Sequence, residues 1–122
     1  MKDSARRDRF LVDEMLSHAE VVAANVRKGR DVFETDATTR YAVEHATELF
    51  AGAAEKIGNQ LKSANPRLPW DRLRELRRGL AHPYDARGDS AYIEQTWRFA
   101  QAELPAIVRR LRSIKFPPES GP

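Results

Sequence analysis

Apolar residues recur along this chain at intervals of three and four positions, the spacing that places side chains on one face of a helix. No stretch shows the apolar–polar alternation that predicts a strand. The first stripe predicts a helix from about Ser4 to Arg30, with Gly29 as its end signal. The second predicts a helix from about Thr39 to Ser63. Their apolar positions are Leu11, Met15, Ala19, Val22 and Val26 in the first segment, and Ala42, Ala46, Leu49, Ala53, Ile57 and Leu61 in the second.

Polar residues and prolines mark the ends of these segments. A loop separates the first two helices, and Asp36 or Thr38 is expected to cap the second one. Pro66 ends that helix, because proline lacks the amide donor and disfavours helical geometry just before itself. Pro69 then fits the first turn of a short third helix, which Pro83 ends. The apolar side of this third helix is formed by Leu73, Leu76 and Leu80.

The last long apolar stripe follows a turn expected from Asp85 to Ser90, in which Asp89 or Ser90 can cap the next helix. Pro105 lies inside this stripe and predicts either a kink or the start of a new helix. We expect the proline-rich tail, about 115–122, to be flexible. The stripe comprises Ile93, Trp97, Ala100, Leu104, Ile107, Val108 and Leu111. The predicted fold is all-α, an up-and-down bundle of four to five helices that forms a single domain over residues 1–122.

Two features of the second predicted helix concern what surrounds it. Gly52 lies in its interior, where glycine costs about 1 kcal/mol relative to alanine, so we expect the close approach of another helix there. Glu44, Glu48 and Glu55 are expected to form an exposed face or a docking surface.

Composition excludes several classes of protein. The chain has no cysteine, so it can form neither disulfides nor thiolate metal sites. No apolar run approaches the roughly 20 residues that span a bilayer, and the charged start does not resemble a signal peptide. We therefore expect a cytoplasmic protein that does not bind membranes. His18 and His45 show no ligand spacing, and neither a metal nor a cofactor is expected.

The net charge of +3 is small, but arginine is unevenly distributed. Between Arg67 and Arg87 there are six arginines and three acidic residues. Arginine suits phosphate because its planar fork donates two parallel hydrogen bonds. Both basic segments can equally be solvated helix faces. The second one contains Arg109, Arg110, Arg112 and Lys115.

The segment from Arg77 to Tyr84 is the best candidate for chemistry. His82 follows Arg77 by five residues, and the proline after it favours a position at the helix end. From there the histidine ring can turn toward Arg77, so that both side chains share one phosphate. A histidine with an ordinary pKa of about 6.5 exchanges protons at neutral pH, and an arginine stabilises charge on a phosphoryl oxygen. Because RNA carries its own nucleophile, the 2′-hydroxyl, such a pair can cleave it without a metal ion.

Arg77, His82 and Tyr84 form an Arg-x4-His-x-Tyr motif that resembles the motif of HepT-like ribonuclease toxins in the HEPN superfamily. Further segments resemble the family in the same order along the chain, and the resemblance covers about residues 6–114. These segments are Arg9-Phe10-Leu11, Phe33, Leu49 to Ala54, Pro66 with Leu68-Pro69-Trp70, and Glu103-Leu104-Pro105.

The resemblance implies a metal-independent endoribonuclease toxin, with transfer RNA among its possible substrates. It further implies a homodimer in which the two Arg and His pairs meet at the interface. Arg77 and His82 are then the catalytic pair, with Arg74 and Arg78 as candidate RNA contacts. The implied partner is a minimal nucleotidyltransferase antitoxin, which neutralises the toxin by transferring AMP to Tyr84.

Two positions depart from the family pattern. The residue after the motif arginine is usually polar, often asparagine, and here it is Arg78. The family pattern has a glutamate directly after the glycine that corresponds to Gly52, and here that position is Ala53. Two other functions therefore stay open. One is a non-catalytic domain that binds RNA or nucleotides, and the other is a helical module that only holds a nucleotidyltransferase.

Overall fold

Every regular element in the described part of the chain is helical, which confirms the predicted all-α fold. The computed structural model describes residues 2–81 and 90–116. The elements in chain order are α1 (Lys2–Val26), α2 (Arg30–Thr35), α3 (Ala37–Lys56), α4 (Asn59–Ala64), α5 (Trp70–Ala81), α6 (Ser90–Arg98), the π-helical segment η1 (Phe99–Glu103) and α7 (Leu104–Arg112). None of the described helices combines the length and the hydropathy that crossing a membrane requires.

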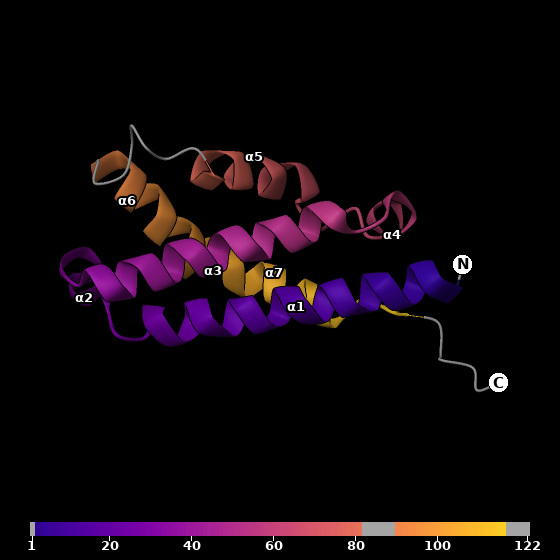
Figure 1. Ribbon diagram of the computed structural model, residues 1–122, viewed down its shortest axis with the longest axis horizontal. Helices are drawn as coiled ribbons and strands as arrows, with labels where there is room; N and C mark the ends of the chain where they lie inside the picture. The colour runs from indigo at the N-terminus through magenta and orange to yellow at the C-terminus, as the bar shows by residue number, and fades with distance from the viewer. Residues whose placement is uncertain (1, 82–89, 117–122) are drawn as a thin grey trace.

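The helix α3 is the centre of the bundle. It packs lengthwise against α1, and the two helices run in opposite directions (Figure 1). The short helix α5 covers α3 on the side away from α1 (Figure 1). The run from α6 through η1 to α7 closes the bundle, because α6 contacts α2 while η1 and α7 pack against α1. α3 therefore has α1 on one side and α5 on the other.

One continuous core holds these helices together. Burying an aliphatic or aromatic side chain of this size is worth roughly 1.5–3 kcal/mol, so the core dominates the stability of the bundle. The aromatic rings of Phe33 and Trp97 join α2 to α6, with centroids 5.3 Å apart. The largest apolar side chains with no more than 1% exposure come from α1, α2, α3, α5, η1 and α7: Met15, Val22, Phe33, Val43, Phe50, Leu73, Phe99 and Leu111.

The predicted loop after the first helix is wrong, because it contains the helix α2. The first helix ends at Val26, before the predicted end at Arg30. Gly29 follows with a φ of 100°, a conformation that favours glycine, and turns the chain directly into α2. Phe33 anchors this short helix, since its ring is fully buried. A single buried aromatic residue thus orders a segment that shows no helical periodicity.

The predicted second helix is in fact two helices. α3 ends at Lys56, and Ile57 adopts an extended conformation with its side chain 3% exposed. Gly58 then precedes α4, and its amide donates a hydrogen bond of 3.1 Å to a carboxylate oxygen of Asp8 on α1. Glycine is a poor helix former, which favours a break at this position. At the break, Asp8 provides the acceptor for the Gly58 amide in place of a carbonyl oxygen of the helix. The break is therefore stabilised by a residue fifty positions away.

The core face of α3 also differs from the prediction. Leu49, expected in the apolar stripe, is 41% exposed, whereas Phe50 is fully buried. Glu44, expected on an exposed acidic face, is 6% exposed. Because α3 packs against α1 and α5 on different sides, its buried surface is wider than a single stripe. The buried positions are Thr39, Val43, Glu44, Ala46, Thr47, Phe50, Ala51, Ala53 and Ala54.

The starts of the later helices lie close to their predicted positions. α5 begins at Trp70, directly after Pro69, and Leu73 is fully buried. α6 begins at Ser90, so this predicted cap residue is the first residue of the helix and not its N-cap. The other predicted cap residue, Asp89, lies outside the described residues, as do Pro83 and most of the predicted turn and tail.

Pro105 is accommodated in the first turn of a new helix, α7, which is one of the two predicted outcomes. The preceding segment η1 is π-helical, and the amide of Leu104 donates to the carbonyl of Phe99, five residues earlier. A proline removes one helical hydrogen bond and crowds the carbonyl four residues before it. The wider π turn absorbs this defect, so that α6, η1 and α7 form one uninterrupted helical run.

Asp36 is the N-cap residue of α3, which confirms the first of the two predicted caps and excludes Thr38. The Thr39 hydroxyl donates a 2.6 Å hydrogen bond to the Asp36 carboxylate. This hydrogen bond is the main cause that lowers the pKa of Asp36 below its ordinary value of 3.8. The ionised carboxylate is therefore the form that the folded helix start prefers.

We predict that Asp36→Asn removes part of the acid sensitivity of the fold. Since the folded pKa of Asp36 is lowered, its contribution to stability is present above the unfolded pKa of about 3.9 and is lost as the pH falls through the folded value. The stability difference between the native chain and Asp36→Asn should thus shrink between pH 6 and pH 2. Urea unfolding at several pH values measures it, with the exposed Asp13→Asn as a control for the loss of one charge. A difference that stays constant over this range would contradict the prediction.

We further predict that Asp8→Ala destabilises the chain by about 1–3 kcal/mol, because the Gly58 amide would lose its acceptor at a site that is 7% exposed. Asp8→Asn should cost less, since its amide oxygen can still accept the hydrogen bond. Equilibrium unfolding in urea measures both free energies, and Asp13→Ala serves as the matched exposed control. Equal stability of Asp8→Ala and Asp13→Ala would show that the hydrogen bond does not hold the break.

Candidate functional site

The rotation of α5 determines which of its arginines meets the rest of the bundle. Leu73 is fully buried and Leu76 half-buried, so this side of the helix faces α3. Arg77 follows Leu73 by four residues and lies on the same side of α5, at the end of the apolar stripe. Arg74 and Arg78 are also four residues apart, and both are exposed. The motif arginine is therefore the one that the helix directs along α3.

The Arg77 side chain lies across α3 between Gly52 and Glu55. Its Nη1 atom forms an ion pair of 3.0 Å with Oε2 of Glu55. A Cβ atom built on Gly52 would lie 3.4 Å from Nε of Arg77 and 3.9 Å from its Cδ. The close approach of another helix that was expected at Gly52 is not observed, because the group next to Gly52 is the Arg77 side chain at ordinary van der Waals distance. About 44% of the Arg77 side chain and 42% of the Glu55 side chain stay exposed, so the pair remains open to solvent.

Two of the other arginines on α5 also have acidic partners. Arg72 donates two hydrogen bonds, of 3.3 and 3.2 Å, to the carboxylate of Glu103 in η1. Arg74 pairs with Asp71 in the first turn of α5 at 3.0 Å. Arg78 is exposed and has no ion pair within the described residues. Of the candidate RNA contacts, Arg78 is consequently the freer cation.

The remaining predicted site residues, His82 and Tyr84, lie outside the described residues. The helix α5 is described up to Ala81, the residue before His82. The structure therefore gives the position of the motif arginine, and the pairing of Arg77 with His82 stays a prediction.

Glu55 is the site residue that the sequence did not reveal. It was expected on an exposed acidic face, and nothing in the sequence paired it with Arg77. The only feature of the sequence that could have indicated a position beside Arg77 is the spacing of three residues between Gly52 and Glu55, which places both near one side of α3. Ala53, where the family pattern expects a glutamate, is 6% exposed and points into the core. The carboxylate beside the motif arginine thus comes from a position two residues later, 200° around α3 from Ala53.

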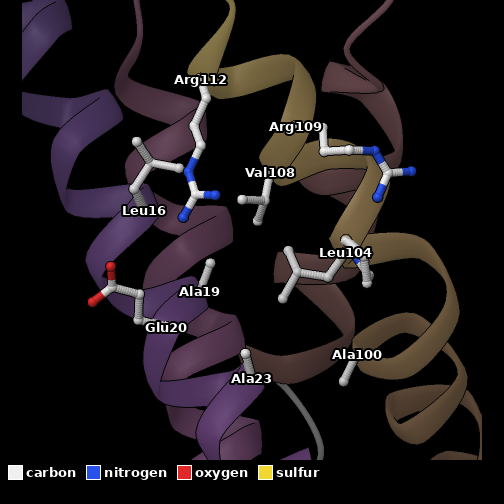
Figure 2. A pocket seen from close by; sticks show the side chains of 10 residues that line it. Leu16, Ala19, Glu20, Ala23, Ala100, Leu104, Val108, Arg109 and Arg112 are labelled. Atoms are coloured by element: carbon white, nitrogen blue, oxygen red, sulfur yellow. The ribbon is translucent and has the colours of Figure 1, made fainter.

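The second basic segment lies on α7. Arg110 donates a 3.1 Å hydrogen bond to the backbone carbonyl of Arg67, which ties α7 to the chain before α5. Arg109 and Arg112 border a groove of about 300 Å³ between α1 and α7, opposite Glu20 (Figure 2). The groove is lined by Leu16, Ala19, Glu20, Ala23, Ala100, Leu104, Pro105, Val108, Arg109 and Arg112. None of these residues belongs to α3 or α5, so the groove is separate from the Arg77 site.

The two described histidines, His18 and His45, lie on different helices. His18 lies 3.7 Å from Glu14, one turn earlier on α1, and His45 is exposed on α3. Within residues 2–81 and 90–116 the structure contains no group of three or more His, Cys, Asp or Glu side chains that could hold a metal ion.

Comparison with known proteins adds a family to this geometry. The family model for HepT-like proteins, described as ribonuclease HepT-like, matches residues 9–114. No curated protein and no solved structure matches the chain significantly. The matched region starts in α1, ends after α7, and includes both Arg77 on α5 and the stretch that follows it to Tyr84. Because the match spans most of an all-helical chain, this protein belongs to the HepT-like ribonuclease family.

Proposed function

We propose that this protein is the ribonuclease toxin of a toxin–antitoxin pair and that it cleaves RNA without a metal ion. Arg77 binds the scissile phosphate and His82 transfers protons. The observation that carries the proposal is the family match across the whole motif, together with the position of Arg77. Its guanidinium lies at the edge of α3, half exposed, where an RNA phosphate can reach it.

The proposed reaction is an internal transesterification. The 2′-hydroxyl loses its proton to a histidine and attacks the adjacent phosphorus, while the bond from phosphorus to the 5′-oxygen breaks. The 5′-oxygen takes up a proton, so the products are a 2′,3′-cyclic phosphate and a 5′-hydroxyl end. Arg77 stabilises the extra negative charge on the phosphoryl oxygens while the phosphorus is five-coordinate.

The proton balance of this reaction favours a homodimer. A general base must accept the proton of the 2′-hydroxyl, and a general acid must protonate the leaving oxygen. Each chain has one motif histidine, His82, and His18 and His45 lie on other helices. Two chains that bring their motifs together at the interface would supply one histidine for each task. Arg74 and Arg78 would then contact flanking phosphates, with transfer RNA among the substrates.

The two departures from the family pattern are compatible with this chemistry. Ala53 fills space in the core, so the missing glutamate leaves no gap beside Arg77. Arg78 is exposed, 100° around α5 from Arg77, and adds positive charge near the motif without contacting Glu55 in the structure. A second basic residue at this position strengthens phosphate binding.

Regulation by an antitoxin completes the proposal. A partner nucleotidyltransferase would transfer AMP to the hydroxyl of Tyr84, two residues after His82. The added phosphodiester carries negative charge and bulk to the place where the substrate phosphate binds. The modified toxin would consequently be inactive.

We predict that purified protein cleaves total cellular RNA in the presence of EDTA, and that Arg77→Ala and His82→Ala each reduce the rate at least about a hundredfold. The reason is that each variant removes a group that acts only on the transition state. Gel electrophoresis and end-mapping of the fragments measure the rate and show whether 2′,3′-cyclic phosphates form.

Arg98→Ala, an exposed arginine on α6, is the control and should cleave like the native chain. If all four proteins behave alike, the catalytic role of the motif is refuted. If the native chain binds RNA without cutting it, a non-catalytic RNA-binding domain is the correct function. If it neither binds nor cuts, the helical module that holds a nucleotidyltransferase is correct.

We also predict that co-expression with a nucleotidyltransferase encoded beside it adds AMP to Tyr84 and restores growth. Intact-mass measurement of the purified chain should show the added nucleotide, and peptide sequencing should place it. Tyr84→Phe should remain unmodified and toxic in the presence of the partner. Protection of Tyr84→Phe by the partner would instead indicate inhibition by binding alone.

A further inference from the structure

The ion pair between Arg77 and Glu55 occupies one of the donors with which the arginine would hold a phosphate, and it neutralises the charge that would attract it. A guanidinium grips an oxyanion through two neighbouring N–H donors, either Nη1 with Nη2 or Nη2 with Nε. In the structure Nη1 is paired with Oε2 of Glu55. One of these two donor pairs, Nη1 with Nη2, is therefore engaged at one end by α3.

The two anions that compete for Arg77 are chemically alike. A carboxylate and a phosphodiester each present two oxygens and one negative charge to the guanidinium. Glu55 is tethered to α3 and is always present beside the arginine. Because the pair is exposed, its strength is modest, and a substrate with several phosphate contacts can displace it.

We propose that Glu55 is an intramolecular competitor that holds Arg77 in a resting state until an RNA phosphate replaces it. This inference rests on the proposed function, since it assigns to Arg77 the phosphate as ligand. Glu55 acts through Arg77 and does not touch the substrate. When RNA binds, Nη1 exchanges the carboxylate for a phosphoryl oxygen, and Glu55 turns into solvent. RNA that offers only one weak phosphate contact is thereby disfavoured.

The position of Glu55 does not suit a structural role. Its side chain is 42% exposed, and α5 is held against α3 by the buried Leu73. Glu103 in η1 provides a matched comparison, because it pairs with Arg72, another arginine of α5, and is 37% exposed. Replacing either acid with glutamine frees one α5 arginine and raises the net charge by one.

The test measures binding of a single-stranded RNA whose riboses are 2′-O-methylated, so that it cannot be cut. Fluorescence anisotropy at one fixed salt concentration gives the dissociation constants of the native chain, Glu55→Gln, Glu103→Gln, Arg77→Ala and the double variant Glu55→Gln with Arg77→Ala. Glu55→Gln should bind about two- to fivefold more tightly than the native chain, the factor that corresponds to an exposed ion pair. Glu103→Gln should gain less, and the gain from Glu55→Gln should vanish when Arg77 is absent.

The proposal is overturned if Glu55→Gln binds no more tightly than the native chain, if Glu103→Gln gains as much, if the gain persists without Arg77, or if no variant binds. Circular dichroism at increasing temperature checks that each variant is folded. Glu55→Ala repeats the measurement with no polar group at this position and should show the same gain.

Cleavage kinetics separate this proposal from the ribonuclease function itself. Glu55→Gln should lower KM for unmodified RNA by about the same factor as Kd and leave kcat unchanged, because the competitor acts on binding alone. A fall in kcat would show that Glu55 orients Arg77 for the reaction, and the competitor role would fail. If Glu55→Gln binds more tightly but no chain cleaves, the competitor role stands and the ribonuclease function fails. If the native chain cleaves RNA through Arg77, and Glu55→Gln has the same KM and kcat as the native chain, the ribonuclease function stands and the competitor role fails.

Discussion

The burial of Leu73 between α5 and α3 sets the rotation of α5, and the charge arrangement at the candidate site depends on that rotation. Side chains four residues apart share a helix face, so Arg77 must lie where the two helices meet. A rotation of α5 by one residue would be 100° and would bring Arg78 to α3 in place of Arg77. The apolar residue thus determines which arginine is presented beside Glu55.

The Arg77 side chain crosses α3 next to Gly52. A Cβ atom at this position would lie 3.4 Å from Nε of Arg77, an ordinary van der Waals contact, so an alanine fits beside the arginine. The helix pays for this glycine with a weaker intrinsic helical tendency of about 1 kcal/mol. Extensive packing of α3 against α1 and α5 offsets that loss.

The ion pairs around α5 contribute specificity more than stability. Arg72, Arg74 and Arg77 pair with acids from η1, α5 itself and α3. All three pairs are substantially exposed, and exposed pairs are individually worth at most about 1 kcal/mol. Because apolar burial holds α5 in place, a pair can be exchanged for a ligand without loss of the fold. This separation is what the proposed exchange of Glu55 for an RNA phosphate requires.

The helical periodicity, the prolines and the absence of alternating strands were enough to predict the all-α bundle, the start of α5 to within one residue of Pro69, and a kink or a new helix at Pro105. Those features are local, since each depends on backbone preferences within a few residues. The ordered set of motifs likewise identified the family from the chain alone. Local signals did not reveal the break at Gly58, because its stabilising partner Asp8 lies on α1.

Only the tertiary structure decided what surrounds the motif arginine. The sequence placed Arg77 in a helix but could not specify the angle between α5 and α3, on which its contact with Glu55 depends. Leu49 was predicted to be buried and is exposed, and Glu44 was predicted to be exposed and is buried. Both predictions failed because α3 has two packing partners rather than one. A sequence determines where each helix is apolar, whereas the packing of helices against one another determines which polar groups meet.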